Sequence, residues 1–209
     1  MVRSKQAGEQ MRAESRQKLL SAARQVFAGQ GYFNSKISDI AQAAGMSQGN
    51  LYWYFPSKEA LLQAVLDQGF AGIEAVLVEA RQYSGNGRAR IDHLIEGFVE
   101  FGRQQGEFTT IFLSLLGHGG VPLLSRLGFD TLEIGKHYHQ HLSAIFSEAQ
   151  AEGAILDLDP DLLVVFFFSF FNGLWMTYNR DWTDLVPPEA IHQAILRLLG
   201  SGPAQGGDR

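Results

Sequence analysis

The chain has 209 residues, 45% of them hydrophobic and 19% charged, a composition typical of a folded globular protein and not of a disordered one. It contains no cysteine, which excludes disulfides and zinc sites built on thiolates. The net charge of −5 is unevenly divided: residues 1–60 hold eight lysines and arginines against four carboxylates, a net +4, which leaves −9 for the rest. A basic N-terminal part suits a nucleic-acid partner, although such segments are also basic by chance.

Residues 1–14 are polar and lack the apolar run of a signal peptide, so we expect a flexible N-terminal arm. Arginines and a lysine in this arm could reach a DNA minor groove, but a disordered tail is the simpler interpretation. The absence of a signal sequence and of cysteine is compatible with a cytoplasmic location, which we expect. From Ser15 to Ala28, apolar residues at helical spacing predict an amphipathic helix that supports the segment after it.

The stretch from Ser35 to Lys58 has the pattern of two short helices joined by a tight turn, which is a helix-turn-helix. Gly45 is placed to end the first helix in the left-handed conformation, and Ser47 to cap the second. Leu51 and Phe55 form the inward face of the second helix. The inward residues of the first helix are Ile37, Ile40, Ala41 and Ala44.

The residues that the second helix turns outward suit contact with DNA. Gln48 and Asn50 can hydrogen-bond base edges, and Gly49 leaves room for a close approach to the duplex. Tyrosines and Lys58 can donate to phosphate oxygens, which sets the register on DNA without reading its sequence. The predicted DNA contacts are Ser35, Lys36, Ser47, Gln48, Gly49, Asn50, Tyr52, Trp53, Tyr54 and Lys58.

Residues 15–62 resemble the DNA-binding domain of the TetR family of bacterial transcriptional repressors. The resemblance is carried by residues at fixed spacing, namely Ala22, Ala23, Phe27, Gly31, Tyr32, Ile40, Ala41, Ala44, Gly45, Ser47, Gly49, Leu51, Tyr52, Phe55, Ser57, Lys58, Leu61 and Leu62. Two departures are conservative: Ser35 keeps the hydroxyl of the usual threonine, with its capping and phosphate roles, and Met46 replaces a core valine. The resemblance implies an effector pocket in the helical body.

A helix from Lys58 to about Tyr83 is predicted by apolar residues on one side. It would span roughly 35–40 Å and connect the DNA-binding part to the body as a single rod. Further helices are predicted over 91–105 and 108–116. The next helical stretch, 122–151, contains two glycines that weaken its continuity. No segment alternates with period two, so no sheet is expected.

Asp159 and Pro160 can cap and start a helix, and the run that follows, 162–176, is apolar on every side. This run is shorter than the roughly 20 residues that cross a membrane and is interrupted by polar residues, so no membrane partner is expected. One face is expected to pack on its own core and the other on a second subunit, together with a final helix over 188–199. The predicted dimer contacts are Phe166, Phe167, Phe170, Phe171, Ile191 and Ile195.

The body holds more aromatic residues than packing alone requires, although core and dimer interface must account for most of them. The resemblance implies an apolar pocket between the body helices, which the sequence permits. The predicted effector contacts are Phe98, Phe101, Phe112, Leu116, His137, Asn172 and Trp175.

His137 and His141 share one helix face at a spacing that can hold a metal. No third ligand is evident at a matching turn and His139 points away, so no metal site is predicted; a polar face or a ligand-contacting histidine is preferred. No phosphate-binding glycine loop, nucleophile elbow or metalloprotease motif appears, so neither an enzyme nor a cofactor is expected.

The sequence therefore predicts an all-α protein with four parts: an arm over 1–14, a three-helix DNA-binding domain over 15–60, a helical effector-binding and dimerisation bundle over 61–200, and a flexible tail over 201–209. We expect a homodimeric repressor that an apolar small molecule releases from a palindromic operator on double-stranded DNA. A ligand-dependent activator is one alternative. A helical ligand-binding module without DNA activity is another, but it would leave Gly49, Tyr52 and Lys58 unexplained.

Overall fold

The computed structural model describes residues 2–178 and 186–200, and these residues form helices and short connections without any strand. The expected tail over 201–209 lies outside the described residues. The helices are α1 Val2–Gln30, α2 Ile37–Ala43, α3 Gln48–Tyr54, α4 Lys58–Gln82, α5 Gly87–Gly117, α6 Val121–Arg126, α7 Thr131–Ala151, α8 Pro160–Tyr178 and α10 Pro188–Leu198.

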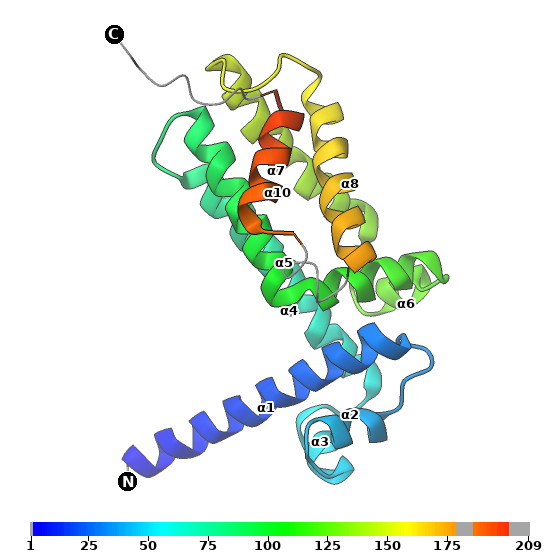
Figure 1. Ribbon diagram of the computed structural model, residues 1–209. Coiled ribbons are helices and arrows are strands. Elements are labelled where there is room, and N and C mark those ends of the chain that lie inside the picture. Colours follow the sequence, from blue (N-terminus) through cyan, green and yellow to red (C-terminus); the bar gives the residue numbers. More distant parts are fainter. Residues whose placement is uncertain (1, 179–185, 201–209) are drawn as a thin grey trace.

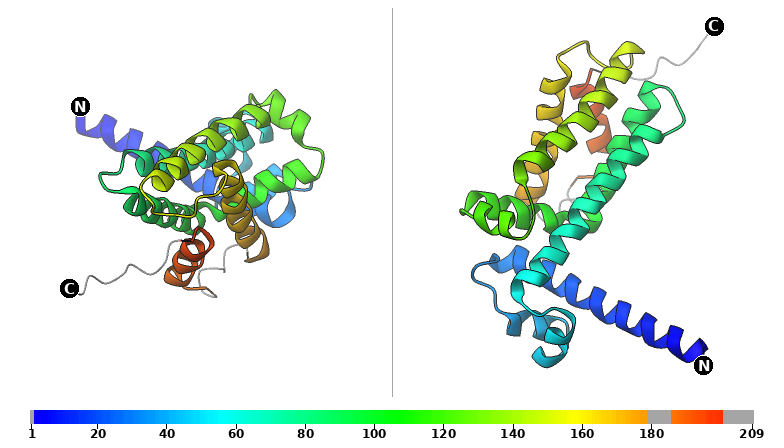
Figure 2. Two further views of the ribbon diagram at one scale, coloured as in Figure 1. Left: turned by 90° about the horizontal axis from the view of Figure 1, so that it is seen from above. Right: turned by 180° about the vertical axis from the view of Figure 1, so that it is seen from behind.

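Helices α1–α3 form a head at one end of the molecule, and α5–α10 form a body at the other (Figure 1). Helix α4 begins in the head and runs through to the far end of the body, as the view from behind shows (Figure 2). It packs against α1 near the head and against α5 and α7 further along. At 1.5 Å per residue its 25 residues span about 37 Å, so the expected rod is present.

The N-terminus differs from the expected mobile arm, because residues 2–14 are the first half of the continuous helix α1. This segment is rich in good helix formers such as Ala, Glu, Gln, Arg and Met, and Gly8 alone is a poor one. Gln10 Nε2 donates to Glu14 Oε1 one turn later at 3.1 Å. Helix α1 thereby places Arg12 next to the helix-turn-helix, with its guanidinium 5.5 Å from the centre of the Trp53 ring.

The break expected between two body helices is present as a kink within one helix, α5. The segments predicted as 91–105 and 108–116 are parts of α5, which begins at Gly87 and is kinked at Gln105, where φ is −137° and ψ is 24°. Of the two glycines in the next stretch, Gly128 has a φ of +88° and separates α6 from α7, whereas Gly135 lies inside α7. A left-handed φ is compatible with glycine and ends a helix, which explains the difference.

Helices α8 and α10 both pack on α5 and lie on the same side of the body (Figures 1 and 2). Asp159 Oδ1 accepts from Asp161 N–H at 2.9 Å, which confirms the predicted start of α8. By length and composition alone, Lys58–Gln82 and Pro160–Thr177 could each cross a membrane. Core helices of soluble proteins meet the same criterion, and both segments contribute residues to the core, Leu66 and Phe167 among them.

Candidate functional site

The turn between α2 and α3 is held by the local chemistry that the sequence predicts. Gly45 has a φ of +64°, its N–H bonds to Gln42 O, and Met46 N–H bonds to Ala41 O, each at 2.9 Å. These two bonds are the pattern of a Schellman motif, which satisfies the last carbonyls of α2. Ser47 Oγ then accepts from Asn50 N–H at 3.2 Å and caps α3. The entry angle of α3 is therefore fixed by bonds within ten residues.

Helix α3 turns one face to solvent and buries the other. Leu51 and the adjoining Phe55 are buried in the head, as predicted. Tyr54 is half-buried, with its ring edge-on to that of Trp53 at 4.6 Å between centroids. The exposed residues of this segment are Ser47, Gln48, Gly49, Asn50, Tyr52 and Trp53. Donors, acceptors and a glycine thus share one open face at the N-terminal end of a helix, the arrangement that can enter a DNA major groove.

Two predicted DNA contacts, Ser35 and Lys58, are engaged inside the head. Ser35 is buried and its hydroxyl donates to Tyr32 O at 2.8 Å, so the expected capping and phosphate contacts of this hydroxyl are not available. The residue that precedes α2 as its N-cap is Lys36, which is exposed. The short loop from α1 folds the Ser35 side chain inward, and the sequence pattern alone does not show this.

Lys58 holds that loop against the start of α4. Its Nζ donates to Ser35 O at 2.6 Å and lies 4.4 Å from the centre of the Tyr32 ring. Burial lowers the pKa of Lys58, and the carboxylates of Glu59 and Asp39 act in the opposite direction. Burial also raises the pKa of Tyr32 to about 12, with a further contribution from Glu59. In this conformation the ammonium group of Lys58 stabilises the head by donating to the Ser35 carbonyl.

The sequence left the basic residues of α1 between DNA contact and simple exposure to solvent, and the structure places two of them beside α3. Arg12 lies over Trp53, and the guanidinium of Arg16 lies 5.1 Å from the centre of the Phe55 ring. Both side chains therefore bring positive charge to the edge of the exposed face. No signal short of the tertiary fold could have placed them there, because α1 and α3 are separate in the chain.

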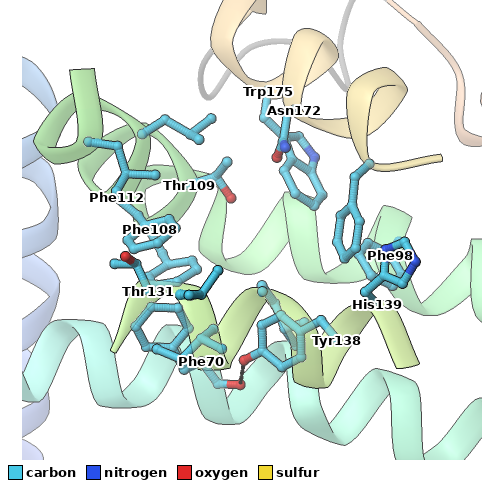
Figure 3. A pocket seen from close by; sticks show the side chains of 17 residues that line it. Phe70, Phe98, Phe108, Thr109, Phe112, Thr131, Tyr138, His139, Asn172 and Trp175 are labelled. Carbon is cyan, nitrogen blue, oxygen red and sulfur yellow. Dashed lines mark hydrogen bonds between the residues drawn. The ribbon is translucent and has the colours of Figure 1, made fainter. Parts of the chain in front are cut away.

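The body contains a cavity of about 540 Å³ between α4, α5, α7 and α8 (Figure 3). Five of the seven predicted effector contacts line it, namely Phe98, Phe112, Leu116, Asn172 and Trp175. The other lining residues are Phe70, Ile73, Phe108, Thr109, Leu113, Thr131, Leu132, Ile134, Gly135, Tyr138, His139 and Phe168. The wall is mostly aromatic and aliphatic with a few polar groups, as is usual for small-molecule sites.

Two predicted cavity residues do not line the wall. Phe101 is buried one layer behind it, with its ring 5.7 Å from Trp175 and 6.1 Å from Phe108. His137 lies on the outer side of α7, where its Nε2 is 2.8 Å from Glu74 Oε2. His139, which was expected to point away from the face of His137 and His141, does so: it lines the cavity and contacts Asp161 at 2.8 Å. His139 replaces His137 in the cavity wall because His139 lies on the side of α7 that faces the core.

Tyr138 marks the inward face of α7. It is buried, and its hydroxyl donates to Phe70 O of α4 at 3.0 Å, the bond drawn in Figure 3. Burial raises the pKa of Tyr138 well above its ordinary value, with Glu74 adding to the effect. This hydrogen bond joins the cavity wall to the backbone of the helix that carries the head.

Four of the six predicted dimer contacts are core residues of their own subunit. Phe167, Phe171, Ile191 and Ile195 are at most 1% exposed, because α8 packs on α5 and α7 and α10 packs on α5. Phe166 is 41% exposed and Phe170 is half-buried, so both remain on the outer side of α8. The other large apolar residues exposed on this helix are Leu162, Val165 and Met176.

A capped helix-turn-helix joined by one rigid helix to a hollow helical body defines a ligand-responsive DNA-binding regulator. Residues 19–65 match the model of a family described as bacterial regulatory proteins, tetR family. The chain is 30% identical over 196 residues to the HTH-type transcriptional regulator RutR of Escherichia coli K12, covering 92% of this chain and 86% of that protein. It therefore belongs to the TetR family of transcriptional regulators.

Other comparisons agree with this assignment. The HTH-type transcriptional repressor DhaR of Mycobacterium sp. strain GP1 is 28% identical over 172 residues, covering 78% of this chain and 81% of that protein. The TetR family regulator PfmR from Thermus thermophilus has the same fold, with a TM-score of 0.70, 22% identity, and coverage of 86% and 97%. The fold is also that of AibR, solved in complex with isovaleryl coenzyme A and operator DNA, with a TM-score of 0.68, 20% identity, and coverage of 88% and 97%.

Proposed function

We propose that this protein is a homodimeric repressor that binds a palindromic operator in the cytoplasm and leaves it when an apolar small molecule enters the body cavity. The observation that carries the proposal is the double role of α4. Its residues Phe70 and Ile73 form part of the cavity wall, and its first turn, at Lys58, holds the helix-turn-helix. A molecule in the cavity therefore touches the same rigid helix that positions the head.

The release follows from a shift between two conformations. A ligand that binds more tightly to a body with α4 displaced will populate that body, and the head moves with α4. Two recognition helices in a dimer must stand roughly 34–36 Å apart to enter successive major grooves. A change in this spacing loses contacts on one half-site at least, so operator affinity falls.

The cavity suggests the chemistry of the effector. Its volume of about 540 Å³ and its aromatic wall fit an apolar molecule. Thr109 Oγ1 and Trp175 Nε1 are enclosed and have no hydrogen-bond partner among the described residues. His139 and Asn172 also line the wall. An effector with an aliphatic or aromatic body and one acceptor group, such as a carbonyl, would pair with an unsatisfied donor here.

The dimer interface is proposed on the outer face of α8. Leu162, Val165, Phe166 and Met176 are exposed at helical spacing on that face, together with Ser169 and Gly173. Such a row is larger than the scattered apolar residues of an ordinary surface, and an equivalent row across a two-fold axis would cover it. Helix α10, in which Leu198 is exposed, lies on the same side of the body as α8 (Figure 1).

The test is selection of bound sequences from a random duplex pool by the purified full-length protein at moderate salt. Enrichment of a palindrome supports a dimeric, sequence-specific regulator, and a reporter carrying that sequence separates repression from activation. Weak binding of all sequences, abolished by salt, would contradict the proposal, because it is the behaviour of non-specific phosphate contact alone.

A further inference from the structure

Three side chains that can bind a metal meet where α4 crosses α7, outside the cavity. His137 and His141 lie one turn apart on α7, with ring centroids 4.6 Å apart. Glu74 of α4 approaches them, and its Oε2 is 2.8 Å from His137 Nε2. One ligand atom from each of the three residues lies within 4.8 Å of the others. The third ligand that the sequence did not show is thus supplied by another helix.

Two imidazoles and one carboxylate are the donor set of many sites for Zn²⁺ and related divalent transition metals. Around a tetrahedral ion with bonds of about 2.0–2.2 Å, such donors stand roughly 3.4 Å apart, and water takes the fourth position. Glu74 Oε2 and His137 Nε2, which are 2.8 Å apart, must open by about 0.6 Å, and a donor pair at the 4.8 Å limit must close by about 1.4 Å. Side-chain rotation can provide both movements, because Glu74 and His137 are 38% and 49% exposed.

The arrangement of His141 is not explained by an ion pair between Glu74 and His137. Its Nδ1 is enclosed and has no hydrogen-bond partner among the residues that the structure describes. An enclosed nitrogen without a partner is unfavourable. Coordination of a metal by the His141 ring would supply a bond to this otherwise unpartnered side chain. Access is open, because a surface groove lined by Ala71, Glu74, Glu133 and His137 leads to the cluster. Glu133, on this approach, is paired with Lys136 at 2.7 Å.

We propose that Glu74, His137 and His141 form a regulatory site for a divalent transition-metal ion such as Zn²⁺, which cross-links α4 to α7. The adjacent Tyr138 hydroxyl already joins these helices through Phe70 O at 3.0 Å. Bound metal replaces the single contact between Glu74 and His137 with a stronger link at the same crossing and stabilises the position of α4 described here. It therefore opposes the displacement of α4 by an effector and strengthens operator binding. The metal site stands on its own geometry, and only its regulatory consequence rests on the proposed function.

The first experiment is calorimetric titration of Zn²⁺ into the full-length protein, freed of metal by chelator and of any purification tag, with the visible absorption of Co²⁺ as a second readout. We expect one ion per chain and a tetrahedral Co²⁺ spectrum. Glu74→Gln, His137→Gln and His141→Gln should each weaken binding by about ten-fold or more. The matched control is His139→Gln, on the cavity side of α7, which should bind as the wild type does. Circular dichroism checks that each variant is folded.

Equal Zn²⁺ binding by wild type and all variants, or no saturable binding at all, would overturn the metal site. The regulatory role is tested separately, by the affinity of wild type and Glu74→Gln for the selected palindrome with and without Zn²⁺. We expect an increase of about five-fold or more for wild type only. An unchanged or lower affinity would overturn the role while the titration still reports on the site. If no palindrome is enriched, the proposed function fails and the titration remains readable.

Discussion

Gly69 of α4 lies directly against the ring of Phe108 of α5: a Cβ added at Gly69 would stand 1.9 Å from Phe108 Cδ2. Gly72, one turn further, leaves similar room for Phe101: a Cβ added at Gly72 would stand 2.8 Å from Phe101 Cε2. Phe108 is also part of the cavity wall and contacts Phe70 edge-on at 5.0 Å. The wall of the cavity therefore rests on the bare backbone of the helix that carries the head, with no flexible side chain between them.

We predict that Gly69→Ala destabilises the protein by about 1–3 kcal/mol, because the methyl group overlaps a buried ring. The change in the free energy of unfolding is measured by urea denaturation. The control is Gly135→Ala in α7, where an added Cβ meets nothing within 4 Å. That variant should be more stable by about 0.5–1 kcal/mol, because alanine lowers the conformational entropy of the unfolded chain. A Gly69→Ala protein as stable as Gly135→Ala would show that the two helices can separate without loss.

We predict that Gln48→Ala and Asn50→Ala relax base preference by about 1–3 kcal/mol at single operator positions. Tyr52→Phe, which removes only a hydroxyl, should weaken binding to all sequences alike, because phosphates carry no sequence information. The measurement is affinity for the selected palindrome and its single-base variants at one salt concentration. Equal losses on every sequence from all three variants would contradict this division of roles.

We predict that Lys58→Met destabilises the head by about 1–3 kcal/mol, because Ser35 O loses a charged donor and the loop after α1 is released. Lys18→Met removes the same charge from an exposed position on α1 and serves as the control in urea denaturation. If both variants are equally stable but Lys58→Met binds all DNA more weakly, then Lys58 contacts phosphate instead, as its sequence position suggested.

We predict opposite outcomes for two neighbouring phenylalanines of α8. Phe166→Asp should give a folded monomer, because Phe166 is 41% exposed on the proposed interface. Phe167→Ala should remain dimeric while folded but lose about 3–5 kcal/mol of stability, because its ring is fully buried. Light scattering gives the mass and urea denaturation the stability. A dimeric Phe166→Asp protein would place the interface elsewhere.

The carboxylate of Glu152 links the end of α7 to the start of α5 and makes stability depend on pH. It accepts from Gly87 N–H and from the Arg90 guanidinium, and these contacts hold its pKa below the ordinary 4.5. A depressed pKa contributes stability above pH 4.5 that is lost as the pH falls through the folded value. We predict that Glu152→Gln lowers Tm at neutral pH and that the difference from wild type narrows below about pH 4.5. Glu79→Gln, at an exposed position of α4, is the control.

Residues close in the chain determined much of this protein by themselves. Gly45, with its left-handed φ, and Ser47, with its capping oxygen, act on backbone groups within five residues, so their roles follow from local chemistry. The family, the all-α fold and the exposed face of α3 follow from the same kind of pattern. The break at Gln105 was predicted as the end of one helix and is present as a kink. The helix through residues 2–14 was not predicted, because helical periodicity alone does not locate where a helix starts.

Tertiary structure decided which side of each helix faces inward. The run in α8 is apolar all round, so its sequence could not separate Phe166 from Phe167, and packing against α5 does. The exchange of His137 for His139 in the cavity has the same origin. Glu74 meets His137 across 63 residues of chain, and no local pattern contains such a pair. Local bonds fix the elements, whereas rotation about each helix axis is fixed only when the core closes.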